Sequence, residues 1–294
     1  MPALRHDNVR GATAMIIAVG ALALLDAGLK TLAPHYSPMQ VAAIRGLSSL
    51  PIVTTWVWLH GGFAQLVRIR LRLHVLRGIL GIMMLATFSY GLRRLPLSEA
   101  YAIFFVAPLL ITMLASPILG EHVDGRRWIA IAFGFAGALI VLRPTGSGAL
   151  TLSGLSILVC AIGYSLSSIT VRVLGRTDTT QSMVFWLMTF IALGAGALAL
   201  PGWRPIQPGH WIVIAGISVS GSLGQWAVTE AFRHGQASFI APFEYTALVW
   251  GVTVDWTLWR TLPGPMTFAG AAVIILCGTY LIRHERVHVE AEKP

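Results

Sequence analysis

Two apolar segments joined by a short polar turn decide the fold of this chain, and they occupy residues 97–143, LSEAYAIFFVAPLLITMLASPILGEHVDGRRWIAIAFGFAGALIVLR. Each segment approaches the 20 or so apolar residues that a helix needs to cross the roughly 30 Å hydrocarbon core of a bilayer. A similar rhythm returns at residues 236–283, QASFIAPFEYTALVWGVTVDWTLWRTLPGPMTFAGAAVIILCGTYLIR. In both stretches an aromatic-rich segment is followed by a polar turn and by a segment rich in small residues. The sequence therefore predicts a membrane protein with an internal repeat.

The composition agrees with a chain that lies mostly in lipid. Of its 294 residues, 55% are hydrophobic and 11% are charged, whereas a soluble domain carries about 25% charged residues. The net charge of +9 does not indicate nucleic-acid binding, because the basic residues fall between apolar segments. Basic residues between spans are typical of the cytoplasmic loops of membrane proteins.

Ten apolar stretches are long enough to be membrane spans. They lie near residues 12–32, 38–60, 74–92, 97–119, 127–143, 151–172, 181–200, 209–232, 237–258 and 266–282. Because a backbone in lipid must satisfy its own hydrogen bonds, we expect each stretch to be a helix and the protein to be all-α.

The distribution of Lys and Arg predicts the orientation. With a cytoplasmic N-terminus, fourteen basic residues fall in cytoplasmic segments and six on the other side, which is the bias of bacterial inner-membrane proteins. Both termini are then cytoplasmic. We expect a tail at 1–10, five-helix repeats at 11–145 and 146–283, and a second tail at 284–294.

An odd number of spans per repeat has a structural consequence. Two consecutive five-span copies must enter the membrane from opposite sides. This is the inverted-repeat arrangement of secondary transporters, in which the substrate binds near the midplane between the repeats.

Three segments carry a resemblance to a known family. SPMQVAAIRGL at 37–47, APLLITMLASPILGE at 107–121 and IAPFEYTALVWG at 240–251 resemble the EamA-type branch of the drug/metabolite transporter superfamily. The resemblance implies ten transmembrane helices arranged as two inverted five-helix repeats around a central cavity, without ATP hydrolysis. Within the superfamily the chain is similar to bacterial exporters of aromatic and other amino acids. It departs from the pattern in lacking a tryptophan midway along the first span and in having Trp259-Arg260 where many relatives have Gly-Glu.

Charged residues inside spans are candidate functional groups, because each costs about 2.5–3.5 kcal/mol to insert at the bilayer centre. Asp26 and Lys30 are four residues apart in the first predicted span, so one helix face can pair them. Arg45 in the second span can neutralise Asp26, and these three residues form the predicted charge network. The alternative is that Lys30 extends to the membrane surface.

Two glutamates are further candidates for the cavity. Glu244 lies seven residues into the ninth span, beside Pro242 and Tyr245, and a proline frees a backbone carbonyl of the kind that transporters use near substrates. A structural ion pair of Glu244 with Arg45 or Lys30 is the alternative. Glu99 begins the fourth span. Glu230 and Asp255 are expected at the membrane interface.

Aromatic residues within the spans suit a cavity for an amino acid or a flat organic molecule. We expect seven of them to line it: Tyr90, Tyr101, Phe105, Tyr164, Trp186, Trp226 and Tyr245. Packing between helices is the alternative for each.

No pattern points to an enzyme, a metal or a cofactor. The sequence has no GxxxxGK phosphate loop, and no His deep in a span that could activate Ser222 as a nucleophile. His284 and His288 alone are a weak metal pair. We therefore predict a secondary transporter, plausibly a monomer, that exports a small metabolite such as an amino acid from a bacterial cytoplasm. A multidrug exporter, a channel and an intramembrane enzyme are the alternatives.

Overall fold

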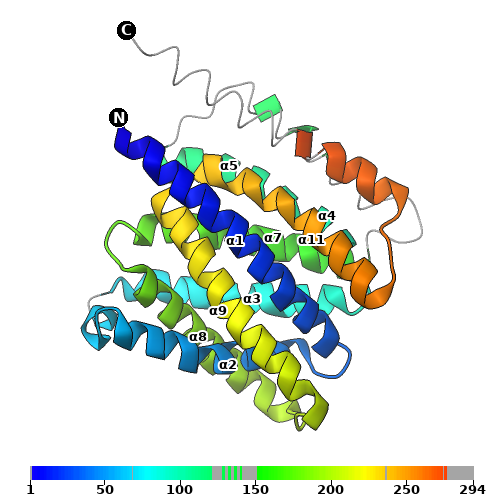
Figure 1. Cartoon of the computed structure of the whole chain (residues 1–294), viewed down its shortest axis with the longest axis horizontal. Helices are drawn as coiled ribbons and strands as arrows, with labels where there is room; N and C mark the ends of the chain where they lie inside the picture. The colour runs from blue at the N-terminus through cyan, green and yellow to red at the C-terminus, as the bar shows by residue number, and fades with distance from the viewer. Residues whose placement is uncertain are drawn as a thin grey trace.

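The computed structural model describes residues 2–67, 69–120, 128–129, 132–133, 136–137, 140, 151–235, 237–273 and 275–276, and all regular structure among them is helical. Figure 1 shows long helices packed in a bundle. They are α1 (Pro2–Leu32), α2 (Pro38–Leu59), α3 (Leu71–Leu92), α4 (Leu97–Phe104), α5 (Val106–Leu119), α7 (Leu152–Leu174), α8 (Thr180–Ala199) and α9 (Trp211–His234). Shorter elements follow as α10 (Ala237–Ile240), η4 (Ala241–Thr246), α11 (Ala247–Val254) and η5 (Asp255–Trp259).

The lengths of these helices agree with the predicted spans. In the described part of the chain, six segments are long and apolar enough to cross a membrane: Arg10–Leu32, Leu71–Leu92, Leu97–Leu119, Leu152–Leu174, Thr180–Gly202 and Pro208–His234. Helix α2 has 22 residues and packs along α8. The predicted span at 127–143 lies mostly outside the described residues, and that at 266–282 lies partly outside them.

Hydroxyl side chains fix where several spans begin. Ser37 accepts a hydrogen bond from the backbone N–H of Gln40, and Pro38 occupies the first helical position of α2. Thr151 and Thr179 cap α7 and α8 in the same way. Such caps satisfy N–H groups that have no partner within the helix.

The fourth and ninth spans are interrupted. Pro108 has no N–H to donate to the carbonyl of Phe104, and the helix changes there from α4 to α5. The ninth span, predicted as continuous over 237–258, consists of α10, the 3₁₀ segment η4, α11 and the π-helical η5. The sequence of η4 contains Pro242, so a regular α-helical ladder cannot run through it.

The two halves of the chain interlock helix by helix. The most extensive contacts between elements are those of α1 with α9, α2 with α8, and α3 with α7, and the first of these pairs is plain in Figure 1. Spans one, two and three thus pack on spans eight, seven and six. This pairing is unchanged when the halves are exchanged, as two related repeats require.

A close approach between α2 and α8 depends on one glycine. A Cβ atom added at Gly46 would lie 2.6 Å from the backbone nitrogen of Ala192. Small residues at helix crossings allow this kind of contact in membrane proteins.

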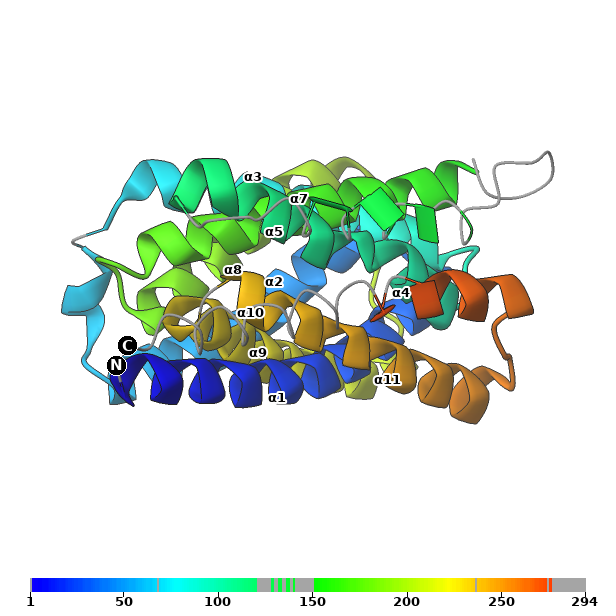
Figure 2. The ribbon, with the colours of Figure 1, turned by 90° about the horizontal axis from the view of Figure 1, so that it is seen from above.

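Contacts between helix ends define two faces of the bundle. At the N-terminal face, Arg10 Nη2 lies 2.6 Å from Glu230 Oε1. At the opposite face, the Tyr36 hydroxyl lies 2.8 Å from His210 Nδ1. Figure 2 shows the bundle along its length, with the N-terminus at the left end. Glu230, expected at the membrane interface, is buried in the N-terminal face.

Candidate functional site

A cavity of about 160 Å³ lies between the two halves of the chain. Helices α1, α2, α3 and α4 line it from the first half, and α7, α8, α9, η4 and α11 line it from the second. Its polar or ionisable lining residues are Asp26, Arg45, Arg77, Tyr101, Cys160, Tyr164, Ser167, Ser168, Gln225 and Glu244.

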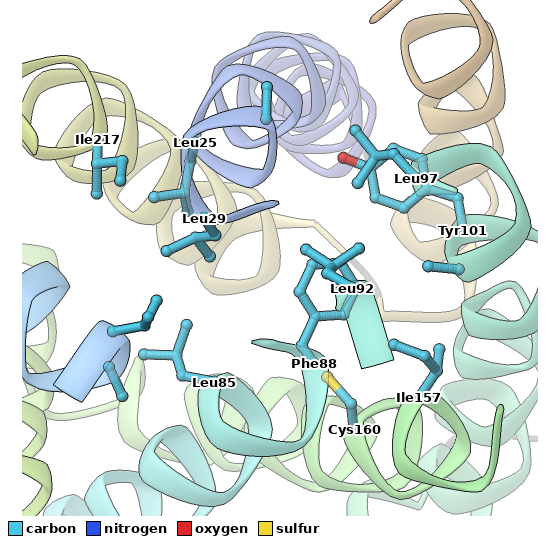
Figure 3. Packing of buried hydrophobic residues seen from close by; sticks show 14 of the residues in the cluster. Leu25, Leu29, Leu85, Phe88, Leu92, Leu97, Tyr101, Ile157, Cys160 and Ile217 are labelled. Atoms are coloured by element: carbon cyan, nitrogen blue, oxygen red, sulfur yellow. The ribbon is translucent and has the colours of Figure 1, made fainter. Parts of the chain in front are cut away.

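A connected row of aromatic rings forms one wall of the cavity. The rings of Tyr101 and Phe88 stack with centroids 6.5 Å apart. Phe88 meets Phe104 edge to face at 6.5 Å, and Phe104 contacts Tyr164 at 5.2 Å. Figure 3 shows Phe88 and Tyr101 in the hydrophobic cluster, together with Cys160. The row offers flat apolar surface between two tyrosine hydroxyls.

One of these hydroxyls binds a carboxylate in the first half of the chain. Tyr101 Oη donates to Asp26 Oδ2 at 2.7 Å. Asp26 precedes the end of α1 at Leu32 by six residues, and Tyr101 follows the start of α4 at Leu97 by four. The pair therefore lies in the part of the cavity nearer the opposite face.

The other hydroxyl binds a carboxylate in the second half. Tyr164 Oη donates to Glu244 Oε1 at 2.9 Å. Glu244 is 5% exposed, and among the described residues its Oε2 has no hydrogen-bond partner. Glu244 follows Ala237 at the N-terminal face by seven residues, so this pair lies nearer that face.

Both acid–tyrosine pairs connect the first and fourth spans of their half, but the acid and the tyrosine lie on opposite members of the pair of spans in the two halves. In the first half the acid is on the first span and the tyrosine on the fourth. In the second half the tyrosine is on the first span, α7, and the acid on the fourth, within η4. The cavity therefore has a similar polar contact toward each of its ends.

Two arginines line the cavity without an acidic partner. Arg45 is 5% exposed, and its Nη2 makes a long contact of 3.5 Å to Gln225 Oε1. Arg77 is 1% exposed and donates from Nη1 to the Met183 carbonyl at 3.3 Å. Neither arginine forms an ion pair within the described part of the chain.

Of the predicted site residues, five line the cavity: Asp26, Arg45, Tyr101, Tyr164 and Glu244. Lys30 does not line the cavity, and it pairs with Asp255 instead of with Asp26. Its Nζ lies 2.7 Å from Asp255 Oδ1 and 4.1 Å from the centre of the Trp259 ring. Asp255, expected at the interface, is fully buried in this contact.

The other predicted residues lie outside the cavity lining: Glu99, Tyr90, Phe105, Tyr245, Trp186 and Trp226. Several have partners that explain their positions. The rings of Phe105 and Tyr245 are buried against each other, with their centroids 5.2 Å apart. The Trp186 indole N–H donates to the Leu66 carbonyl, and Trp226 packs edge to face on Trp56. For Phe105, Tyr245, Trp186 and Trp226 these contacts agree with packing between helices, the alternative for each aromatic residue.

Sequence reasoning missed Arg77, Gln225 and Phe88 as lining residues. Arg77 is one of the fourteen basic residues counted in cytoplasmic segments, yet it lies six residues inside α3. Its place within the apolar run HVLRGILGIMML was the available signal. Gln225 and Phe88 carried no such signal. No cluster of three metal-ligating side chains occurs among the residues that the structure describes.

Comparisons with known proteins agree with this architecture. A model of the EamA-like transporter family matches residues 9–143 and again residues 151–283. A riboflavin transporter of Vibrio cholerae is 26% identical over 96% of both chains. An S-adenosylmethionine uptake transporter of Rickettsia prowazekii is 26% identical over 89% of this chain and 88% of its own.

Two further matches have lower sequence identity. A pseudopaline exporter of Pseudomonas aeruginosa is 24% identical over 72% of this chain and 75% of its own. A crystal structure with 18% identity covers 95% of this chain and 97% of its own, with a TM-score of 0.70. That likeness shows the fold, and the double family match confirms the two-repeat organisation.

Proposed function

Because the chain belongs to the EamA-like transporter family, and is thus a small-metabolite transporter of the membrane, we propose that it carries amino acids or closely related metabolites by alternating access. We further propose export from the cytoplasm as its direction, with the N-terminal face and both termini on the cytoplasmic side of a bacterial inner membrane and a monomer as the working unit.

The observation that carries this proposal is the cavity between the repeats. Its ionisable side chains include the carboxylates of Asp26 and Glu244 and the guanidinium groups of Arg45 and Arg77, and an aromatic row forms one wall. Groups of both charges suit a small molecule that itself carries both charges, and the rings suit an aromatic side chain.

Alternating access is supported by the placement of the acid–tyrosine pairs. Each pair joins two helices of one repeat, and each lies toward a different face. An inverted-repeat transporter opens by moving one repeat or bundle relative to the other. Separate polar contacts toward the two ends suit such a cycle better than an open pore.

The relatives differ in their transport direction and in their substrates. One is named as an uptake transporter and another as an exporter, and their named substrates differ. Another metabolite or a drug is therefore the main alternative cargo. The family and these relatives are transporters, which makes the enzyme alternative weaker.

Flux into proteoliposomes tests the proposal. Purified protein is reconstituted and supplied with radiolabelled amino acids, with riboflavin and S-adenosylmethionine as alternative cargo. We expect saturable uptake of at least one amino acid above the rate in protein-free liposomes. If no amino acid crosses faster than in protein-free liposomes, the substrate assignment is wrong, and flux that does not saturate favours a channel. Efflux from preloaded cells then determines the direction.

A further inference from the structure

We infer that Arg45 binds an anionic group of the transported molecule, at a subsite between α2 and α9. This inference rests on the proposed transport function and specifies the chemistry of the substrate. It starts from a buried cation whose hydrogen-bonding capacity is largely unused. Arg45 is 5% exposed, it lines the cavity, and its Nε has no partner among the described residues.

Asp26, the acidic residue that interacts electrostatically with Arg45, does not form an ion pair with it in the described part of the chain. The two charged groups make no contact within 4.0 Å among these residues. Asp26 instead accepts the Tyr101 hydroxyl at 2.7 Å. A buried charge of this kind is normally paired, so the remaining partner is expected to be a ligand.

The face of α9 that meets α2 provides further polar groups. Ser218 Oγ donates to the Ser48 carbonyl of α2, and Gln225 Oε1 receives the long contact from Arg45. Ser222 lies between them at helical spacing. It is 7% exposed, and its Oγ has no partner within the described residues. A hydroxyl and an amide beside a guanidinium are the usual donors to a carboxylate or phosphate.

A glycine lets the guanidinium lie against α9. A Cβ atom added at Gly221 would be 3.5 Å from Arg45 Nε. The Nε of Arg45 therefore lies close to the backbone of α9 at a position without a side chain, beside Leu25, whose Cδ1 would be 3.2 Å from the same Cβ. The planar guanidinium matches the two oxygens of a carboxylate or phosphate.

The second cavity arginine differs in its surroundings. The Nε of Arg77, like that of Arg45, has no partner among the described residues, but Arg77 also donates from Nη1 to the Met183 carbonyl. It lies one turn from His74, which pairs with Asp178 at 2.7 Å near the N-terminal face. Arg77 is therefore the matched comparison: an equally buried arginine in the same cavity, without the polar face of α9.

The test uses pairs of probes that differ in one anionic group. The probes are L-phenylalanine and L-phenylalaninamide, and riboflavin 5′-phosphate and riboflavin, titrated against the purified protein with tryptophan fluorescence as the readout. We expect the anionic member of at least one pair to bind about 10- to 100-fold tighter, the range for hydrogen bonds to a charged group. Arg45→Gln should reduce that preference to about 3-fold or less, and should reduce it more than Arg77→Gln does, whereas Arg94→Gln should keep it.

Several results would overturn the subsite. These are equal binding within both pairs, preference for the members that lack the anionic group, no binding of either probe that carries it, or loss of preference in Arg77→Gln but not in Arg45→Gln. Arg94→Gln, which changes an exposed arginine at the opposite face, controls for the loss of positive charge alone. Arg45→Lys keeps the positive charge but loses the planar guanidinium with its paired N–H donors, and it should retain part of the preference. It serves as the test variant if Arg45→Gln does not fold.

Failure of the subsite is distinguishable from failure of the transport function. Saturable flux of the compounds that lack the anionic group, at the rate of those that carry it, would leave transport intact and remove the anion subsite. Absence of flux for every compound, with preferential binding of the anionic probes, would instead keep the subsite and remove the proposed cargo.

Discussion

Lys30 and Asp255, 225 positions apart in the chain, form a contact of 2.7 Å between their side chains at the opposite face of the bundle. The same carboxylate accepts the backbone N–H groups of Leu97 and Ser98 at 3.1 and 2.7 Å, and the Ser98 hydroxyl at 2.7 Å. One buried acid from the ninth span therefore caps α4 and neutralises a lysine of α1.

Breaking this contact should destabilise the protein. Lys30→Met leaves Asp255 buried without its cation, and Asp255→Asn removes the charge that Lys30 needs. Each single change should lower the free energy of unfolding by about 3–5 kcal/mol, the range for a broken buried ion pair. The double variant should lose less than the sum of the two. Thermal unfolding of the purified variants measures this, and additive losses would show that the two residues do not interact.

Glu244→Gln should lower transport with little loss of folded protein. The amide can still accept the Tyr164 hydroxyl, but it replaces the ionisable carboxyl group on the cavity wall. We expect flux to fall by about 10-fold, the effect of losing one charged hydrogen bond between this carboxyl group and the substrate. Glu99→Gln is the comparison, because Glu99 lies outside the lining. Wild-type flux in Glu244→Gln would return Glu244 to a structural role.

Removing either tyrosine hydroxyl should weaken transport. Tyr101→Phe and Tyr164→Phe keep the aromatic row and leave Asp26 or Glu244 without its donor. The free energy of unfolding should fall by about 1–3 kcal/mol in each variant, and the rate of flux should fall with it. Tyr90→Phe, outside the lining, controls for the change of residue. Unchanged flux in both variants would mean that the pairs do not take part in the cycle.

The crossing of α2 and α8 should be sensitive to a single methyl group. Gly46→Ala places a Cβ 2.6 Å from the backbone of Ala192, whereas nothing lies within 4 Å of a Cβ at Gly216. Gly46→Ala should therefore cost about 1–3 kcal/mol of stability, as overpacking does, and Gly216→Ala should not. Melting temperatures in detergent compare the two, and equal values would argue against tight packing at this crossing.

The pattern of apolar segments and basic loops was sufficient to predict the helical fold. Span length and repeat number follow from the sequence. Five of the predicted site residues also line the cavity, but Tyr90 and Tyr245 do not, so a polar or aromatic residue deep in a span does not by itself mark the cavity. The partner of Lys30 could not be predicted in this way. Asp26, one turn away, was the nearer acid, and only the packing of the ninth span on α1 and α4 brings Asp255 to Lys30.

The placement of aromatic residues was harder to predict for a geometric reason. Trp186 and Trp226 lie deep in their helices, but depth alone does not fix which side of a helix faces the cavity. In lipid an apolar ring can face a neighbouring helix or the bilayer at similar cost, so periodicity does not separate these positions. Glu244 was easier because a carboxylate is excluded from the lipid side.

Asp255 also bears on how the chain is assembled during synthesis. Helices α1 and α4 leave the ribosome long before residue 255 does, yet in the described part of the chain it is Asp255 that pairs with Lys30 and accepts the first N–H groups of α4. The first repeat thus reaches the bilayer with these groups unpaired. Its maturation is complete only when the ninth span has been inserted, so a nascent chain that stops before that point lacks the contact that closes its own first half.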